Sequence, residues 1–198
     1  MRSSAKVAVL TVLLCLGAGE AHAAQPPRQA VQVVAGAIEQ TGYTHLYDPA
    51  YVQLTYPGGD PPPDRGVCSD VVVRAFRRAG VDLQKEVHED MARNFSVYPN
   101  QWHLRAPDPN IDHRRVPNLM TYFTRMGKSL PISHKPEDYA PGDVVAWDLG
   151  GGLLHIGVLS DTRASGSRDY EIVHNIGAGA RLEDVLFSWT IIGHYRYF

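Results

Sequence analysis

The first two thirds of the chain carry hydrophobic residues at helical spacing. Val31, Val34 and Ile38 fall on one face before Gly42 ends the pattern, which predicts a first helix. The same spacing predicts three further helices, over residues 68–79, 81–95 and 116–126. Between the last two, residues 98–115 are rich in Pro, Asn and Asp and lack periodicity, so we expect a long loop that is functional or mobile.

From Pro141 onward the pattern changes to short β-branched and aromatic runs separated by Gly, Asp and Ser turns. These runs predict four strands, over residues 144–147, 155–159, 170–174 and 190–197. An isolated earlier strand is predicted at 51–56, just before a Pro- and Gly-rich loop. Helices first and strands later predict an α+β fold, with N-terminal helices packed on a C-terminal antiparallel sheet.

Residues 1–23 have the pattern of a secretory signal peptide. Arg2 and Lys6 precede an apolar run too short to span a bilayer, and Ala21-His22-Ala23 is a small-residue cleavage site. We therefore expect a periplasmic or secreted protein whose mature part, residues 24–198, forms a single domain with a helical and loop insertion at about 81–130.

Charge argues against a nucleic-acid partner, and hydropathy argues against a membrane span in the mature protein. The 19 Lys and Arg residues against 21 Asp and Glu give a net charge of -2, so we expect no nucleic-acid partner. No apolar run after the signal region approaches the length of a membrane span, so we expect none in the mature protein.

Cysteine usage points to one residue. Cys15 leaves with the signal peptide, so the mature chain carries a single thiol, Cys68, in a compartment where thiols are normally oxidised in pairs. A lone cysteine is often a small buried core residue. Cys68, however, stands in the first turn of a predicted helix, where the helix dipole and free amide groups are expected to lower the thiol pKa from about 8.5 toward neutrality.

Two histidines supply candidate partners for this thiol. His155 begins an apolar strand and His174 ends the next, so neighbouring strands can bring both imidazoles to one sheet edge near the helix terminus. We expect His155 to act as base and then acid, and His174 to orient it. Each histidine alone is more often structural, but the ordered trio favours catalysis. Catalysis by these three residues is expected to require neither a metal nor a cofactor.

The same residues resemble a known family. Segments 56–59 and 64–70, with a tyrosine, a Gly-Gly turn and a Cys-Ser pair, are similar to the nucleophile region of NlpC-type papain-like cysteine peptidases. Segments 141–147 and 155–158 resemble that family's leading strand and catalytic-histidine strand, and Val173-His174 matches the place of its third polar residue. The resemblance implies a papain-like fold with Cys68 as nucleophile.

A narrower resemblance is carried by segments 107–118 and 193–197. They are similar to a YijF-like group of secreted bacterial proteins, a domain of unknown function within the same broad fold. The fold is therefore implied twice, by two sets of residues.

Two positions depart from the NlpC pattern, which usually has Asp before the cysteine and Gly two residues after it. This chain has Val67 and Asp70 there. Asp70 could cap the helix, bind a substrate amine or oppose the thiolate, and all three interpretations stay open. The resemblance also implies an oxyanion or substrate hydrogen bond from Tyr56, whereas a tyrosine ending a strand is more often a packing residue.

Arg114 and Arg115 belong to a dense polar cluster in the long loop, with Asp112 and His113. Either arginine is suited to gripping a substrate carboxylate through a bidentate contact. An internal salt bridge that fixes the loop is the alternative. Trp102, Trp147 and Trp189 are expected to be core or cleft-wall aromatics.

Together these features predict an exported cysteine hydrolase that cleaves an amide through an acyl-enzyme, without cofactor. The resemblance implies peptidoglycan stem peptides as substrate. The same site could also serve a thioesterase or an acyltransferase. The alternative from another class is a non-enzymatic module that binds peptidoglycan or a partner protein through a cleft whose chemistry has lapsed, and Asp70 is the residue that favours it.

Overall fold

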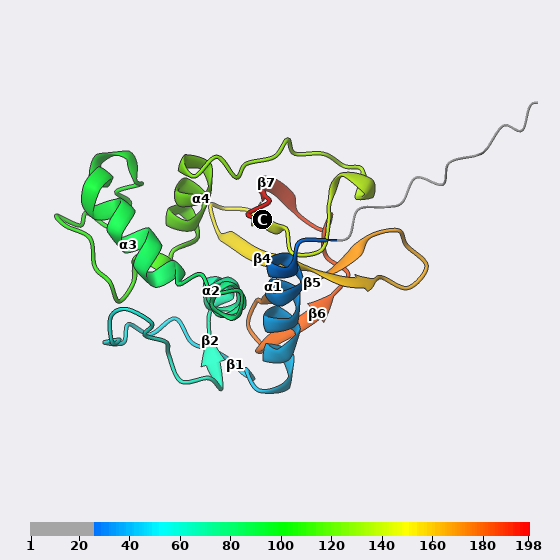
Figure 1. The fold of residues 1–198 in the computed structure, drawn as a ribbon, viewed down its shortest axis with the longest axis horizontal. Helices are drawn as coiled ribbons and strands as arrows, with labels where there is room; N and C mark the ends of the chain where they lie inside the picture. The colour runs from blue at the N-terminus through cyan, green and yellow to red at the C-terminus, as the bar shows by residue number, and fades with distance from the viewer. Residues whose placement is uncertain (1–25) are drawn as a thin grey trace, which may run out of the picture.

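A computed structural model describes residues 26–198 and places four helices before a five-stranded antiparallel sheet (Figure 1). The helices are α1 Arg28–Glu39, α2 Cys68–Arg78, α3 Leu83–Asn94 and α4 Val116–Arg125. The sheet has the order β6-β5-β4-β3-β7, with β3 Val144–Asp148, β4 Leu154–Arg163, β5 Tyr170–Asn175, β6 Ala180–Glu183 and β7 Thr190–Tyr195. This confirms the predicted α+β class, with N-terminal helices packed on a C-terminal antiparallel sheet.

Short elements connect these layers. A parallel pair is formed by β1 Leu46–Tyr47 and β2 Arg65–Gly66, and four 3-10 turns lie at η1 Gln40–Gly42, η2 Phe95–Val97, η3 Asp112–Arg114 and η4 Pro136–Asp138. Within residues 26–198 no helix is long and apolar enough to cross a membrane. The predicted signal peptide lies outside the described residues.

One predicted strand is wrong. Residues 51–56 are irregular, because side chains rather than a neighbouring strand satisfy their backbone. The Leu54 N–H donates to the side chain of Asn110 at 2.8 Å, and the Gln84 amide donates to the Thr55 carbonyl at 3.0 Å. The strands β1, β2 and β6 were not predicted; each has only two to four residues, too few to show a period.

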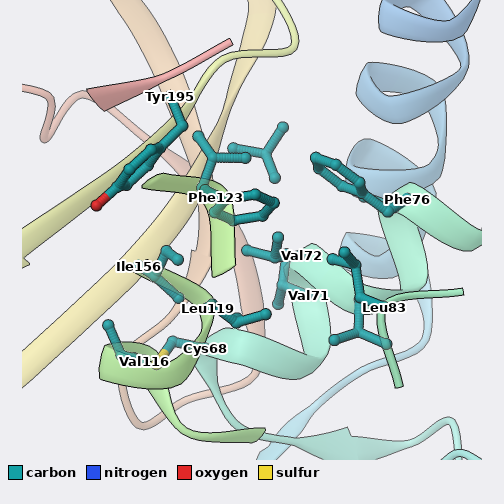
Figure 2. Packing of buried hydrophobic residues seen from close by; sticks show 14 of the residues in the cluster. Cys68, Val71, Val72, Phe76, Leu83, Val116, Leu119, Phe123, Ile156 and Tyr195 are labelled. Atoms are coloured by element: carbon teal, nitrogen blue, oxygen red, sulfur yellow. The ribbon is translucent and has the colours of Figure 1, made fainter. Parts of the chain in front are cut away.

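Strand alternation gives the sheet two buried faces. On the first, Ile156, Val158 and Val173 pack against Val72 and Phe76 of α2. Figure 1 shows α1 and α2 lying over β4 and β5, and Figure 2 shows the packed side chains of this helix-side core. This packing holds α2 along the strand that carries His155.

The opposite face of the sheet has its own core. Trp147, Leu159 and Ile172 pack there with Leu186, whose carbonyl accepts the indole N–H of Trp147 at 2.9 Å. Gly157 belongs to this face, since a Cβ at that position would meet atoms of Ile172 and His174. The histidine side chains on this side of the sheet, His155 and His174, are therefore buried among aromatic and aliphatic groups.

Gly157→Ala is expected to destabilise the protein by about 1–3 kcal/mol, because the added methyl overpacks a filled interface. Its Cβ would lie 2.6 Å from Cγ2 of Ile172 and 3.2 Å from Cβ of His174. Urea unfolding measures the change. Gly42→Ala is the matched control, since no heavy atom lies within 4 Å of its Cβ. Equal unfolding free energies for the two variants would contradict the packing described.

Candidate active site

Cys68 is the first residue of α2 and lies at one end of the helix-side core, beside Val116 and Ile156 (Figure 2). The helix begins here because the carboxylate of Asp70 turns back and accepts the N–H of Val67 at 2.7 Å. Gly66 leaves room for that turn, since a Cβ there would lie 2.9 Å from Oδ2 of Asp70. Local backbone chemistry thus fixes the position of the thiol.

Asp70 is also paired with Arg114. The two side chains are 1% and 2% exposed, Nε donates to Oδ1 at 2.9 Å, and Nη2 donates to Oδ2 at 3.0 Å. Arg114 donates further to the carbonyls of Ala50 and Asp48. Of the interpretations left open, Asp70 caps the helix and also opposes a thiolate at Cys68, and Arg114 forms the internal salt bridge. Their assignment as substrate-binding residues is wrong, because both side chains are buried and their polar groups bind each other and the backbone instead of a substrate.

The predicted lowering of the Cys68 pKa is also wrong. Burial raises the pKa of this thiol to about 12, and the nearby Asp70 carboxylate adds to the rise. The backbone N–H groups of Ile156, Ser69 and Cys68 act in the opposite direction but do not offset the loss of water. The resting side chain is therefore a neutral thiol.

The two histidines meet as predicted. Nε2 of His155 lies 2.8 Å from Nδ1 of His174, and Nε2 of His174 lies 2.8 Å from Oε2 of Glu183. Glu183 was not predicted. It lies on β6 opposite Ile172, which shares a face with His174, so only the pairing of β5 with β6 reveals it. We call this His155–His174–Glu183 chain the relay.

The carboxylate at the end of the relay sets the tautomer of both rings. A carboxylate only accepts, so His174 carries its proton on Nε2 and presents a bare Nδ1. His155 must then donate from Nε2, which leaves its Nδ1 as the free basic nitrogen. Burial, and next the neighbouring His174, lower the pKa of His155 to about 3, and burial lowers that of His174. Both rings are neutral near pH 7.

The thiol and the relay contact different groups in the resting structure. The His155 ring stacks on Trp147 and meets Trp189 edge-on, with centroids 5.8 and 5.9 Å away. The sulfur lies instead beside the N–H of Ile156, the next residue of β4. Across residues 26–198, no hydrogen bond joins the Cys68 sulfur to His155. The resting arrangement is two neutral groups beside β4: the imidazole carried by His155 itself, and the thiol of α2 beside the next residue, Ile156.

A cavity of about 380 Å³ opens beside Cys68, and its lining includes Leu154, Tyr47, Trp102 and Arg115. Tyr47 lies opposite Gly66 in the β1–β2 pair, and burial followed by the neighbouring Cys68 raises its pKa. We call this cavity the Cys68 cleft.

Tyr56 does not line the Cys68 cleft, so its predicted role is wrong. Its side chain is 42% exposed and meets the His88 ring edge-on at 5.2 Å. Tyr47 holds the position beside the thiol instead, and it was missed because it comes from a two-residue strand. No cluster of three potential metal ligands occurs in the described part of the chain.

Comparison with known sequences gives two matches. A family model described as a domain of unknown function, DUF1287, matches residues 34–197. The chain is also 54% identical over 202 residues to the uncharacterized protein YijF of Escherichia coli strain K12, with 98% of each chain covered.

Solved structures of lower similarity come from NlpC-type proteins. NlpC1 and NlpC2 of Trichomonas vaginalis match with TM-scores of 0.42 and 0.41 at 14% and 13% identity, over 83% and 87% of this chain. A lipoprotein-like protein of the NLP/P60 family from Staphylococcus aureus matches with a TM-score of 0.41 at 16% identity, over 89% of this chain. The chain spans 44% to 50% of the length of these proteins.

Arg114→Lys is expected to lower the free energy of unfolding by about 3 kcal/mol, because one ammonium group replaces a buried guanidinium that bonds a carboxylate and two carbonyls. Arg115→Lys is the matched control at the next position, which forms no ion pair within residues 26–198 and is half-buried. Thermal and urea unfolding compare the two. A larger loss from Arg115→Lys would reverse the roles assigned here.

The depressed pKa of His155 predicts acid sensitivity. Unfolding returns the ring to a pKa near 6.5, so the unfolded chain takes up a proton between about pH 6.5 and pH 3 that the folded chain refuses. Stability is therefore present above pH 6.5 and falls as the pH drops through that window. From pH 7 to pH 5 the wild type should lose about 2 kcal/mol more than His155→Asn. Replacing the exposed His103 by Asn should leave the wild-type slope, and identical slopes for all three proteins would refute the assignment.

Proposed function

The chain belongs to the DUF1287 family, as its YijF-like resemblance predicted, and from the site just described we propose that it is an exported cysteine hydrolase. It cleaves an amide bond, in peptidoglycan stem peptides, through an acyl-enzyme on Cys68. One observation carries the proposal: the thiol opens on a cleft at the start of the strand whose histidine heads a relay ending in a carboxylate.

The relay supplies the proton chemistry. The transfer requires Nδ1 of His155 to come within hydrogen-bond reach of the Cys68 thiol when substrate is bound. It then accepts the thiol proton as the sulfur attacks the substrate carbonyl, so the thiolate need not accumulate beforehand. The imidazolium that forms is stabilised through His174 by Glu183. His155 then gives the proton to the leaving amine as the C–N bond breaks, and water hydrolyses the thioester in a second cycle.

Developing negative charge on the carbonyl oxygen needs donors near the sulfur. The backbone N–H groups of Cys68 and Ser69 lie at the start of α2 and already act on the thiol. Tyr47 lines the same cleft, near enough to Cys68 that the thiol contributes to the raised pKa of the Tyr47 hydroxyl. We assign the two amides as the oxyanion site and Tyr47 as an additional donor.

Substrate and location rest on the sequence. The signal-peptide pattern of residues 1–23 supports export, and the NlpC-type segments around Cys68 and His155 support a cell-wall peptide. A cleft of this volume, open to solvent and lined by Trp102 and Tyr47, accommodates a short peptide.

One observation favours a second candidate function, a binding module without turnover. The Cys68 thiol is buried, its pKa is raised, and it makes no hydrogen bond with His155 in the described chain. The two functions share the cleft and differ in whether a covalent intermediate forms.

Incubation with defined peptidoglycan fragments, followed by mass analysis of the products, tests the proposal. Wild-type protein should release a stem-peptide fragment, and Cys68→Ala should lose at least about 10³-fold in rate while keeping its fold, because the substitution removes the nucleophile and little volume. Circular dichroism and Tm serve as the folding control. Turnover by folded Cys68→Ala would exclude the nucleophile assignment, and fragment binding without cleavage by the wild type would support the binding module.

The relay predicts an order of effects. His155→Ala should reduce kcat/KM by about 10²- to 10⁴-fold, since both proton transfers are lost. His174→Ala and Glu183→Gln should each cost less, because they leave the basic ring in place and disturb only its tautomer and orientation. Steady-state kinetics on the three variants decide this. A larger loss from His174→Ala would mean that the roles of the two histidines are exchanged.

A further inference from the structure

We propose that Arg115, held against the face of Trp102, makes the Cys68 cleft selective for ligands that carry a carboxylate beside the group attacked by the thiol. The proposal names a substrate class for the site and in that respect rests on the proposed function. The selectivity itself is a property of the cleft and does not require turnover.

Arg115 is a cation in the Cys68 cleft whose charge is not neutralised by an ion pair. Its guanidinium carbon lies 3.9 Å from the centroid of the Trp102 ring, and both residues line the cleft with Cys68. In the chain from residue 26 onward no carboxylate pairs with it, and Asp112 and Asp108 act on it only at longer range. A bound carboxylate would stabilise this partly buried guanidinium, because it would supply the paired anion that Arg115 lacks.

The neighbouring residue, Arg114, places a second guanidinium in the same wall of the cleft, but its hydrogen-bond donors already have partners. Arg114 also borders the cleft, but Asp70 and two backbone carbonyls occupy its donors. The residues that line the cleft include no Asp or Glu. Because Asp70, which lies behind the lining, neutralises Arg114, Arg115 is the one cation of the lining without a paired anion among the described residues.

Stacking also determines which part of Arg115 is available. When a guanidinium lies flat over an indole, its π-face is covered and its N–H groups point outward in the plane of the group. That edge is the one that binds a carboxylate through two parallel hydrogen bonds. Trp102, which is 40% exposed, thus covers one side of the Arg115 guanidinium, whose carbon lies 3.9 Å from the ring centroid.

Paired thiol reagents test the selectivity without any substrate. Iodoacetate and iodoacetamide form the same S–C bond and release the same iodide, but only iodoacetate carries a carboxylate. The two rate constants are measured at pH 9 on the folded full-length chain, by mass analysis of the tryptic peptide 66–74, which contains Cys68 and excludes Cys15. We expect the iodoacetate to iodoacetamide ratio to fall about tenfold in Arg115→Gln, the effect of one charge-assisted hydrogen bond.

Arg93→Gln is the charge-matched control. Its side chain is 66% exposed on α3, so removing it changes the net charge equally but leaves the cleft intact. A ratio that Arg115→Gln leaves unchanged, or that Arg93→Gln lowers equally, overturns the proposal. No labelling of folded protein by either reagent also overturns it, because then no ligand of that size reaches the thiol beside Arg115.

The test separates the two proposals. A ratio that depends on Arg115 in a protein that cleaves no peptidoglycan fragment supports the carboxylate site and counts against the hydrolase. Cleavage of peptidoglycan fragments by a protein whose iodoacetate to iodoacetamide ratio does not depend on Arg115 supports the hydrolase and counts against the carboxylate site.

Discussion

The buried ion pair between Asp70 and Arg114 is the interaction on which the site depends. It joins the first turn of α2 to the segment before α4, and through two backbone carbonyls it holds the chain around Ala50 as well. Because Asp70 also caps α2, the same carboxylate fixes where the helix begins and where Cys68 stands. Buried pairs are costly to break, since the remaining charge has no partner. The Asp70–Arg114 pair thus joins the wall of the Cys68 cleft to the helix turn that carries Cys68.

Burial rather than the helix dipole sets the resting state of the thiol. A helix N-terminus stabilises a negative charge by about 0.3–1 kcal/mol, and by about 2 in favourable geometry. Raising the thiol pKa from 9.0 to about 12 corresponds to about 4 kcal/mol against the thiolate. In the resting site the thiol of Cys68 and the imidazole of His155 are therefore both neutral. In this arrangement the relay matters because Glu183 fixes the tautomer in which Nδ1 of His155 carries no proton.

The sequence predicts the elements and the main site residues where a period or a neighbour along the chain defines them. Val72 and Phe76 share the buried face of a helix, and the strands with His155 and His174 are adjacent in sequence and in the sheet. What it could not predict depends on contacts distant in sequence. Tyr47 reaches the thiol through a two-residue strand, and Glu183 reaches His174 through the pairing of β6. The adjacent residues Arg114 and Arg115 have the same local sequence pattern but different surroundings, because only Arg114 pairs with a buried carboxylate, that of Asp70.

Trapping of the covalent intermediate tests the central claim most directly. A peptidoglycan fragment is mixed with wild-type protein, the reaction is quenched in acid during turnover, and tryptic peptides are analysed by mass. The account predicts an acyl adduct on the peptide 66–74, attached to Cys68, which disappears as product accumulates. An adduct on any other residue, or product release at the wild-type rate after Cys68 has been alkylated, would contradict it.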